Sequence, residues 1–302
     1  MKKKVAILGA SGMLGSMLLD YFSKSKEFKI IATVRSQKEL LALSKYKKVE
    51  FKVLDVEFAD QQVLRKALKG AAWVINAIGI IKPYIHDDNA VEIERALRIN
   101  ALFPHNLARA LEKTKIIQIA TDCVYSGAKG AYKENDPHDA LDVYGKTKSI
   151  GEAHFGNFYN LRCSIIGSEL SSHLSLMDWF LTRPEGSKVN GYTNHFWNGV
   201  TTLHFAKLCE GIIAREIKIA HLQHLIPTGK ISKYEMLKIF ANEFNRPDTT
   251  ITKTNAPEII DRTLSTEKPK INKKIWQAAG YSKIPSVPEM IRELGDYLSK
   301  NE

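Results

Sequence analysis

A short apolar run that ends in closely spaced glycines constrains the fold of this chain more than any other feature. Val5-Ala6-Ile7-Leu8 has the composition of a buried strand, and glycines follow it directly, while apolar residues continue after them at helical spacing. Gly9 permits a tight exit from the strand, Gly12 lets backbone N–H groups approach a pyrophosphate, and Gly15 lets the helix pack closely on the strand. The pattern predicts a dinucleotide-binding turn. Its expected contact residues are Gly9, Ser11, Gly12, Met13, Leu14 and Gly15.

The composition is that of a globular protein with room for a catalytic site. The chain has 302 residues, of which 44% are hydrophobic and 25% charged, so we expect one large or two unequal domains. No apolar stretch approaches the ~20 residues that cross a bilayer. The apolar run after Met1-Lys2-Lys3-Lys4 is too short for a signal peptide. We therefore expect a cytoplasmic protein with no membrane partner.

Cysteine content and charge exclude further classes of protein. Cys123, Cys163 and Cys209 lie far apart and form no CxxC pair, which argues against a disulfide framework or a zinc site. His221 and His224 would point to opposite faces of a strand, so we expect no metal site. The formal net charge of +11 comes from lysines in short, scattered clusters. A solvated basic surface explains this charge, and we expect no nucleic-acid partner.

Strand-like and helix-like segments alternate through the first half of the chain. The strand candidates are short, nearly continuous apolar runs rich in Val and Ile, as in strands buried on both faces. Further strands are predicted at 29–34, 49–54, 72–77, 116–120 and 158–163, and helices at 39–44, 60–69, 89–113 and from Tyr144. This order predicts an α/β fold, a Rossmann-type doubly wound sheet of six parallel strands with helices on both faces.

The regular alternation ends after Ser164. We expect residues 1–164 to form the Rossmann domain that binds the coenzyme, and residues 165–302 to form mainly a smaller, less regular substrate-binding domain. Helices are predicted at 201–213, 233–244 and 288–299. The first of these, near 200–215, could return to the Rossmann domain.

Residues at the strand ends bear on the choice of coenzyme. An NAD site normally has Asp or Glu about 20 residues beyond the glycines, whereas the 2′-phosphate of NADP needs a cation there. Arg35 follows the second strand without a carboxylate beside it. This favours NADP(H), while a plain surface role for Arg35 leaves NAD(H) open. Further coenzyme contacts, or ordinary loop residues, are Asp55 and Val56 after the third strand and Ala77, Ile78 and Gly79 after the fourth.

Tyrosine followed four residues later by lysine occurs three times, so the pattern alone decides little. The pairs are Tyr125/Lys129, Tyr144/Lys148 and Tyr234/Lys238. The first is broken by Gly127 and belongs to a loop, and the third lies on a helix far beyond the strand series. The second opens a helix between the fifth and sixth strands, where i,i+4 spacing puts both side chains on one face and the carboxyl ends of the strands face the ligand.

Tyr144 and Lys148 together suit proton transfer. A phenol has a pKa near ~10, which is too high for efficient proton exchange at neutral pH. A nearby ammonium stabilises the phenolate, so we expect Lys148 to lower the pKa of Tyr144. Thr121, at the end of the fifth strand, offers a hydroxyl that can hold a substrate carbonyl oxygen. Asp122 beside it is a helper or a structural cap.

Taken together, these motifs resemble the extended short-chain dehydrogenase/reductase superfamily, and within it the dTDP-4-dehydrorhamnose reductase family of nucleotide-sugar enzymes. The resemblance covers the first 165 residues or so and is looser beyond. The residues that carry it are Gly9, Gly12, Gly15, Asp55, Asn76-Ala77-Ile78-Gly79, Asn100, Thr121-Asp122-Cys123-Val124-Tyr125-Ser126-Gly127 and Tyr144-Gly145-Lys146-Thr147-Lys148. It implies that Thr121, Tyr144 and Lys148 are catalytic. It also implies that Asn100 supports the sheet or a proton-relay water at the coenzyme.

The resemblance further implies a substrate site around Asp122, Cys123 and Val124. Related dehydratases carry Glu where Cys123 stands, so dehydration is disfavoured. Arg162 matches the family's arginine at the close of the sixth strand, where it could serve the substrate or pair inside the fold.

Later residues depart from the family pattern and extend the substrate site. His195, Trp197 and Asn198 could line the sugar pocket, and Trp197 could equally be a core anchor. Arg262 is a candidate diphosphate clamp, with a surface ion pair as the alternative.

The implied reaction is NADPH-dependent reduction of a nucleotide-linked 4-keto sugar in surface polysaccharide biosynthesis, with Tyr144 delivering the proton. Two alternatives stay open: a nucleotide-sugar epimerase with tightly bound NAD, and a non-catalytic NADP-binding regulatory subunit. The expected partner is a small nucleotide sugar, and a homodimer is the oligomer considered. The sequence specifies neither the sugar nor its nucleotide.

Overall fold

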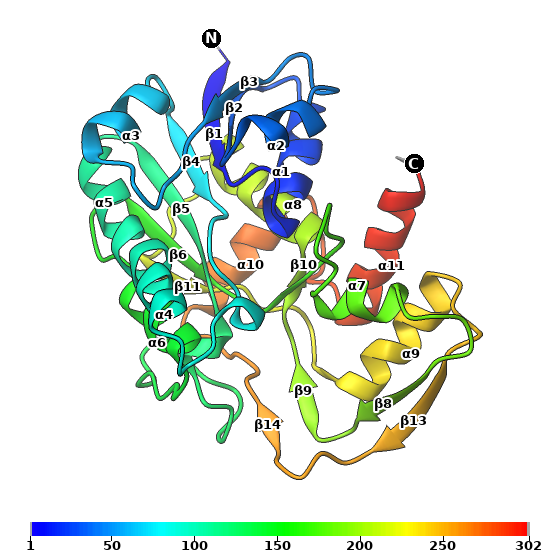
Figure 1. Ribbon diagram of the computed structural model, residues 1–302. Coiled ribbons are helices and arrows are strands. Elements are labelled where there is room, and N and C mark those ends of the chain that lie inside the picture. The colour runs from blue at the N-terminus through cyan, green and yellow to red at the C-terminus, as the bar shows by residue number, and fades with distance from the viewer. Residues whose placement is uncertain (1, 301–302) are drawn as a thin grey trace.

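A seven-stranded parallel sheet forms the centre of this computed structural model, which describes residues 2–300 (Figure 1). Its strands are β1 (Lys3–Leu8), β2 (Phe28–Val34), β3 (Glu50–Val53), β4 (Trp73–Asn76), β5 (Lys115–Ala120), β6 (Phe158–Arg162) and β11 (Leu222–His224). They lie in the order β11-β6-β5-β4-β1-β2-β3, and every neighbouring pair is parallel. The Rossmann-type α/β prediction is confirmed. The sheet has one strand more than the six expected, because β11 joins the edge of β6.

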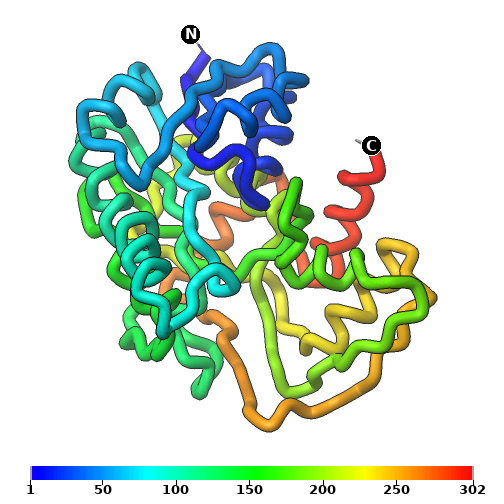
Figure 2. Tube along the Cα trace, in the orientation of Figure 1, coloured from blue at the N-terminus to red at the C-terminus, as the bar shows by residue number. Residues whose placement is uncertain are grey.

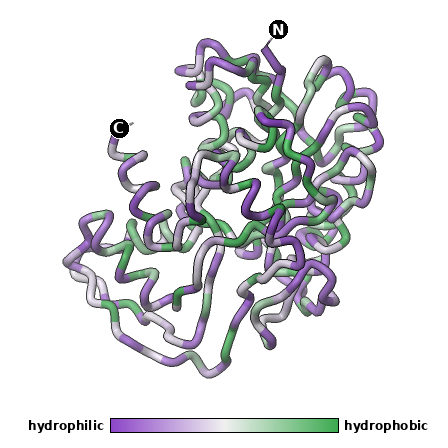
Figure 3. The backbone as a smooth tube through the Cα atoms, turned by 180° about the vertical axis from the view of Figure 1, so that it is seen from behind, coloured by the Kyte–Doolittle hydropathy of each residue, from purple (hydrophilic) through white to green (hydrophobic). Residues whose placement is uncertain are grey.

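The central strands are largely apolar because both faces of the sheet are covered. Along β1, Val5 and Ile7 pack into one hydrophobic cluster, and Ala6 and Leu8 pack into the cluster on the opposite face. Alternate side chains of a strand point to opposite faces, so both sets are mostly apolar in such a sheet. Seen from behind, the hydrophobic segments run through the strands and inner helices (Figure 3).

Helices cover both faces. The helices are α1 (Met13–Ser23), α2 (Gln37–Ala42), α3 (Gln61–Ala67), α4 (Ala90–Ala96), α5 (Phe103–Ala110), α6 (Val143–Ile150), α7 (Leu176–Leu181), α8 (Thr202–Ala214), α9 (Lys233–Glu243), α10 (Pro269–Ala278) and α11 (Val287–Ser299). On one face α8 packs between α1 and α10, and on the other α3 packs against α5. Single short helical turns occur at Lys82–Tyr84 and Asp122–Val124.

The single helix predicted at 89–113 is divided by a π-helical turn at Leu97–Leu102 between α4 and α5. Pro104 has no N–H, so it cannot bond to the Asn100 carbonyl as an α-helix would require, and Phe103 N instead bonds to the Arg98 carbonyl. Gly151 lies against the Asn100 carbonyl, where a Cβ would come within 1.9 Å of that oxygen.

The second half of the chain builds smaller sheets, and much of it, coloured yellow-green to orange in Figure 2, lies to one side of the N-terminal half. Its strands are β7 (Ile165–Ile166), β8 (Lys188–Tyr192), β9 (His195–Trp197), β10 (Val200–Thr201), β12 (Ile231–Ser232), β13 (Thr250–Thr254) and β14 (Ile260–Asp261). β7 pairs with β10, β8 pairs with β13, and β9 lies between β12 and β14. Helices α8, α9 and α11 occur within a residue or two of their predicted bounds, while α7, α10 and these short strands were not predicted.

Segments beyond residue 164 complete the main sheet. Helix α8 covers α1, and β11 extends the edge formed by β6. The division between residues 164 and 165 therefore stays a prediction about folding units. Within residues 2–300, no helix has the length and apolar character needed to cross a membrane.

Candidate active site

The turn between β1 and α1 is shaped to receive an anionic group. Gly9 has a φ of +78°, and a Cβ on Gly15 would lie 1.9 Å from the Gly9 carbonyl oxygen. Gly12 is open, since only that same oxygen comes near its missing Cβ, at 3.5 Å. As the N-cap of α1, Gly12 provides no side-chain cap, and the first turn contains no acidic residue. The backbone N–H groups of this helix end thus face an uncrowded, positively polarised space.

The other residues of this turn that were predicted to contact the coenzyme differ in their burial. Ser11 and Met13 are half-buried, while the Leu14 side chain packs into the hydrophobic core. A contact between Leu14 and a coenzyme is therefore restricted to its backbone.

The loop after β4 lies directly beside this turn. A Cβ on Gly9 would meet the Ile78 side chain at 2.8 Å, and a Cβ on Gly79 would lie 3.7 Å from the Lys148 Nζ. The loop thus joins the glycine turn to Lys148. Asn76 holds its start, because the Asn76 side chain donates to the Gln118 Oε1 at 2.6 Å and accepts from the Ile78 N–H at 3.1 Å.

Asn100 holds the end of the same loop. Its Oδ1 accepts from the Ile80 N–H at 2.8 Å, and its Nδ2 donates to the Ile80 carbonyl at 2.9 Å and to the Thr147 hydroxyl at 3.4 Å. The side chain is 1% exposed. Asn100 therefore fixes the position of this loop relative to α6.

Thr121, Tyr144 and Lys148 come together where β5 ends and α6 begins. The Thr121 hydroxyl accepts from the Cys123 N–H at 3.1 Å, donates to the Asp122 Oδ1 at 3.3 Å, and lies close to Tyr144. The Lys148 ammonium donates to the carbonyl of Ile119, near the end of β5, at 3.2 Å. Asp142 caps the start of α6 by accepting from the Gly145 N–H. From this helix, the Tyr144 and Lys148 side chains reach the end of β5. The helix thus delivers the tyrosine and lysine to one point of the sheet.

Burial dominates the electrostatics of this group. It raises the pKa of Tyr144, and the hydrogen bond from Thr121 opposes that shift. Burial also lowers the pKa of Lys148 to about 8, with Glu152 acting in the opposite direction. Burial is therefore the largest influence on the phenol pKa in this structure, and the lowering of that pKa by Lys148 stays a prediction.

A second set of charged groups faces this site from the C-terminal half. Asp122 is buried, which raises its pKa, and the positive charges of Arg262 and Lys233 oppose the shift. Arg262 donates from Nε to the Tyr125 carbonyl at 2.8 Å, and among residues 2–300 it forms no ion pair within 4 Å. The structure thus places Arg262 near Asp122 and Cys123, at the candidate site and without the alternative surface ion pair.

Lys233 was missed by the sequence reasoning. It is the first residue of α9, and burial lowers its pKa to about 8, while Asp122 and Cys123 act in the opposite direction. The sequence signal at this point is the capping box of Ser232 and Glu235, which predicts the start of a helix and does not indicate a ligand. Only the packing of α9 brings Lys233 to Asp122.

Arg162 does not lie free at the site. Its side chain is 0% exposed and pairs with both carboxylate oxygens of Glu152, at 2.9 and 2.5 Å. The same guanidinium donates to the Tyr125 hydroxyl and to ring nitrogens of His138 and His224. The substrate role considered for Arg162 is therefore corrected in favour of the internal pair, since all its donors already have partners.

Several other predicted residues are also part of the core. Val124 is fully buried against Tyr125, Tyr132 and Leu264, so its side chain cannot contact a substrate. Val56 is buried in one hydrophobic cluster and Trp197 in the other. Trp197 is therefore the core anchor that was the alternative to its place in the sugar pocket.

Asn198, His195 and Asp55 have partners in the polypeptide. Asn198 is buried and clamps Leu264, donating to its carbonyl at 2.8 Å and accepting from its N–H at 2.9 Å. His195 is half-buried on β9, with Nε2 at 3.1 Å from the Glu258 carbonyl. Asp55 is exposed after β3, where it accepts from the Glu57 N–H. Asn198 therefore holds the backbone in place, while His195 and Asp55 keep part of their surface open.

Comparison with known proteins identifies the family. A sequence model described as the RmlD substrate binding domain matches residues 3–298. The chain belongs to this family. The resemblance to dTDP-4-dehydrorhamnose reductases is thereby confirmed, as solved structures of that enzyme share the fold.

Relatives of this RmlD-type chain include catalysts of different kinds and a subunit of another enzyme. Methionine adenosyltransferase 2 subunit beta of Danio rerio is 23% identical over 82% of this chain and 76% of its own length. A dTDP-4-dehydrorhamnose reductase of Bacillus anthracis in complex with NADP is 18% identical, with a TM-score of 0.73, covering 98% of this chain and 100% of that one. A UDP-glucuronic acid 4-epimerase of Bacillus cereus in complex with UDP-glucuronic acid and NAD is 16% identical, with a TM-score of 0.71 over 99% and 100%. At these identities the two structures show a shared fold.

Proposed function

We propose that this chain is an NADPH-dependent reductase of a nucleotide-linked 4-keto sugar, acting in the cytoplasm in surface polysaccharide biosynthesis. The observation that carries the proposal is the continuous path from the glycine turn to the proton-transfer group. Gly9 lies against Ile78, Gly79 lies next to Lys148, and Lys148 shares the end of β5 with Thr121 and Tyr144.

The cradle at Gly12 and the uncapped end of α1 fit the pyrophosphate of a dinucleotide, and Gly79 and Lys148 fit its nicotinamide ribose. When bound, NADPH would supply the hydride. Similarity in fold to a reductase solved with NADP supports this choice of coenzyme.

The chain's own residues provide the proton. Tyr144 would donate its hydroxyl proton to the keto oxygen, and the Thr121 hydroxyl, close to Tyr144, would hold that oxygen in place. The Lys148 ammonium would stabilise the negative charge left on Tyr144. Cys123 provides no strong acid here, since burial raises its pKa to about 12, which disfavours expulsion of water from the sugar.

Arg262 and Lys233 are the proposed partners of the nucleotide diphosphate. Both are cations beside Asp122, and the terminal nitrogens of Arg262 have no hydrogen bond within residues 2–300. A guanidinium can bind phosphate oxygens in a bidentate manner. Asp122, Cys123 and His195 would contribute to the sugar side of the site.

A homodimer is proposed on the face formed by α4, α6 and the π-helical turn. These segments contact one another, and Val91, Leu102 and Ile150 expose large apolar side chains there. A second copy of this face would cover them. Sedimentation of the purified chain as a monomer at micromolar concentration would contradict this proposal.

The activity is tested by following NADPH oxidation with a panel of 4-keto sugars linked to different nucleotides. We expect turnover with at least one of them. Tyr144→Phe should abolish it and leave NADPH affinity within a few-fold, because only the proton donor is lost. Tyr234→Phe, at another Tyr/Lys pair outside the site, is the matched control. Full activity of Tyr144→Phe would remove the assigned acid.

Two other functions are favoured by particular relatives. The epimerase fold similarity favours a nucleotide-sugar epimerase, for which nicotinamide should remain bound through purification. The similarity to a subunit of methionine adenosyltransferase favours a non-catalytic NADP-binding subunit. That role predicts a copurifying partner and no NADPH oxidation with any sugar nucleotide.

A further inference from the structure

The Glu39 carboxylate occupies the space between the glycine turn and the end of β2. Its Oε2 accepts from the Ser11 hydroxyl at 2.8 Å and from the Arg35 backbone N–H at 3.0 Å. Its Oε1 lies 3.7 Å from the Arg35 Nη2. Glu39 thus joins the two segments between which the adenosine ribose of a Rossmann coenzyme binds.

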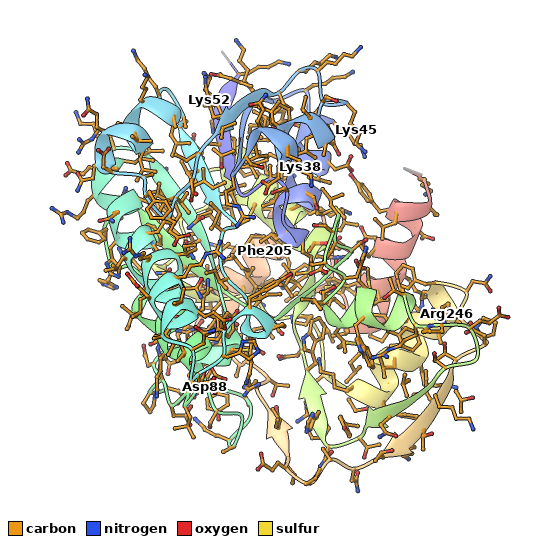
Figure 4. The ribbon with its side chains drawn as sticks, in the orientation of Figure 1. Lys38, Lys45, Lys52, Asp88, Phe205 and Arg246 are labelled. Atoms are coloured by element: carbon orange, nitrogen blue, oxygen red, sulfur yellow. The ribbon has the colours of Figure 1, made fainter. Side chains whose placement is uncertain are left out.

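All groups around this carboxylate are hydrogen-bond donors or cations. A hydroxyl, a backbone N–H and a guanidinium surround it, which is the donor set that a phosphate would also require. Lys38 on α2 and Lys45 in the turn after it are exposed and add positive charge to this part of the surface (Figure 4). The chain has therefore built an anion site and filled it with its own side chain.

Local structure explains why Glu39 reaches this position. Ser36 is the N-cap of α2 and accepts from the Glu39 N–H at 3.3 Å. Glu39 lies in the first helical turn, from which its side chain extends back to the end of β2. Its side chain is 25% exposed, compared with 60% for Arg35. The Glu39 carboxylate is thus held in place by more of the protein than the Arg35 guanidinium is.

We propose that Glu39 sets the coenzyme preference of this chain by opposing the 2′-phosphate of NADP(H). The inference rests on the proposed use of a nicotinamide coenzyme. A 2′-phosphate and Glu39 would compete for the same donors and repel each other, so NADPH must displace the carboxylate. The ribose hydroxyls of NADH can instead donate to Glu39 where it stands. The chain therefore accepts both coenzymes, and Glu39 limits the advantage that Arg35 gives to NADPH.

The test measures binding of NADH and NADPH to the ligand-free protein by calorimetry. Glu39→Gln should raise the affinity for NADPH relative to NADH by about tenfold, since it removes one negative charge next to the phosphate. The nucleotides 2′,5′-ADP and 5′-AMP should show the same change in ratio, because they differ by that phosphate alone. Glu27→Gln, an exposed glutamate before β2, removes the same charge elsewhere and should leave both ratios unchanged.

The outcomes separate this inference from the proposed function. An unchanged ratio in Glu39→Gln, or an equal loss of affinity for both coenzymes, overturns the role of Glu39 alone. Binding of neither coenzyme nor either fragment to the natural chain overturns the proposed function, and the inference with it. Glu39→Ala, which also favours a helix, provides the second variant should Glu39→Gln fail to fold.

Discussion

Lys148 shows how one buried charge can serve a site and weaken the fold. Its ammonium is buried, and its pKa of about 8 lies below the usual value of 10.5. Between these two pH values the unfolded chain binds a proton that the native chain does not, so stability rises with pH there and is reduced at neutral pH. A lysine buried in this way is a source of instability that the fold tolerates, as expected of a residue kept for the proposed function.

Lys148→Met should therefore stabilise the protein and inactivate it. Methionine fills a similar volume without a charge, and we expect the free energy of unfolding to increase by about 1–3 kcal/mol, as one pKa unit corresponds to about 1.4 kcal/mol. Denaturant unfolding at pH 7 measures the change, and coenzyme titration should show weaker binding. Lys146→Met, at an exposed position of the same helix, is the control. A clear loss of stability in Lys148→Met would contradict this account.

The histidines around Arg162 make the protein sensitive to acid. His138 and His224 accept hydrogen bonds from Arg162, which requires unprotonated ring nitrogens. Burial, followed by the charge of Arg162, lowers the pKa of His224 to about 4, and burial lowers that of His138.

Stability should fall as the pH decreases from about 6.5 toward 4. In this range the unfolded chain binds a proton at His224 that the native chain does not, which contributes a slope of up to about 1.4 kcal/mol per pH unit, and the lowered pKa of His138 acts in the same direction. Denaturant unfolding at pH 7, 6 and 5 tests this. His224→Gln, which keeps an acceptor for Arg162, should reduce the slope. A pH-independent stability over this range would rule out neutral histidines as its cause.

The π-helical turn shows how an element positions a site without touching it. Pro104 releases the Asn100 carbonyl, Gly151 packs on that carbonyl, and the Asn100 side chain holds both polar groups of Ile80. The loop after β4, which contains Gly79, is thereby placed against Lys148.

Asn100→Ala should loosen this loop. The partly buried N–H and carbonyl of Ile80 would lose their partner, which costs about 1 kcal/mol of stability. Coenzyme affinity should fall about tenfold, because binding would have to restore the loop position, and about 1.4 kcal/mol corresponds to a tenfold change in affinity. Thermal unfolding and coenzyme titration measure the two effects, with Asn106→Ala at an exposed position of α5 as the control. Unchanged coenzyme affinity would show that the loop position does not depend on Asn100.

Across the whole molecule, late segments of the chain complete the first half. Helix α8 packs on α1, Tyr21 donates to Glu210 at 2.7 Å, and β11 pairs with β6. A chain ending at residue 164 would expose the apolar face that α8 covers and the open edge of β6.

A fragment of residues 1–164 should therefore not fold cooperatively. We expect it to aggregate or to show weak near-UV circular dichroism and no sharp thermal transition, whereas residues 1–302 should unfold cooperatively. A fragment extended through residue 226, which includes α8 and β11, should recover part of the transition. Cooperative unfolding of the shorter fragment would establish residues 1–164 as an independent domain.

Local sequence determined the central fold and the position of Tyr144 and Lys148, the proposed proton-transfer pair. The β1 strand, the glycine turn and the start of α6 depend on residues a few positions apart, so period, turn chemistry and i,i+4 spacing reported them correctly. Tyr144 and Lys148 could be chosen over two identical pairs because the strand order had already located the carboxyl ends of the sheet.

Tertiary structure decided which polar residues remain available to a ligand. Arg162, Val124, Trp197 and Asn198 were drawn into the core, while Lys233 and Glu39 reached sites that their neighbours in sequence do not indicate. Each outcome depends on a partner 10 or more residues away, such as Glu152 for Arg162 and Leu264 for Asn198. Burial and hydrogen bonding are properties of such distant pairs, and a local pattern holds no information about them.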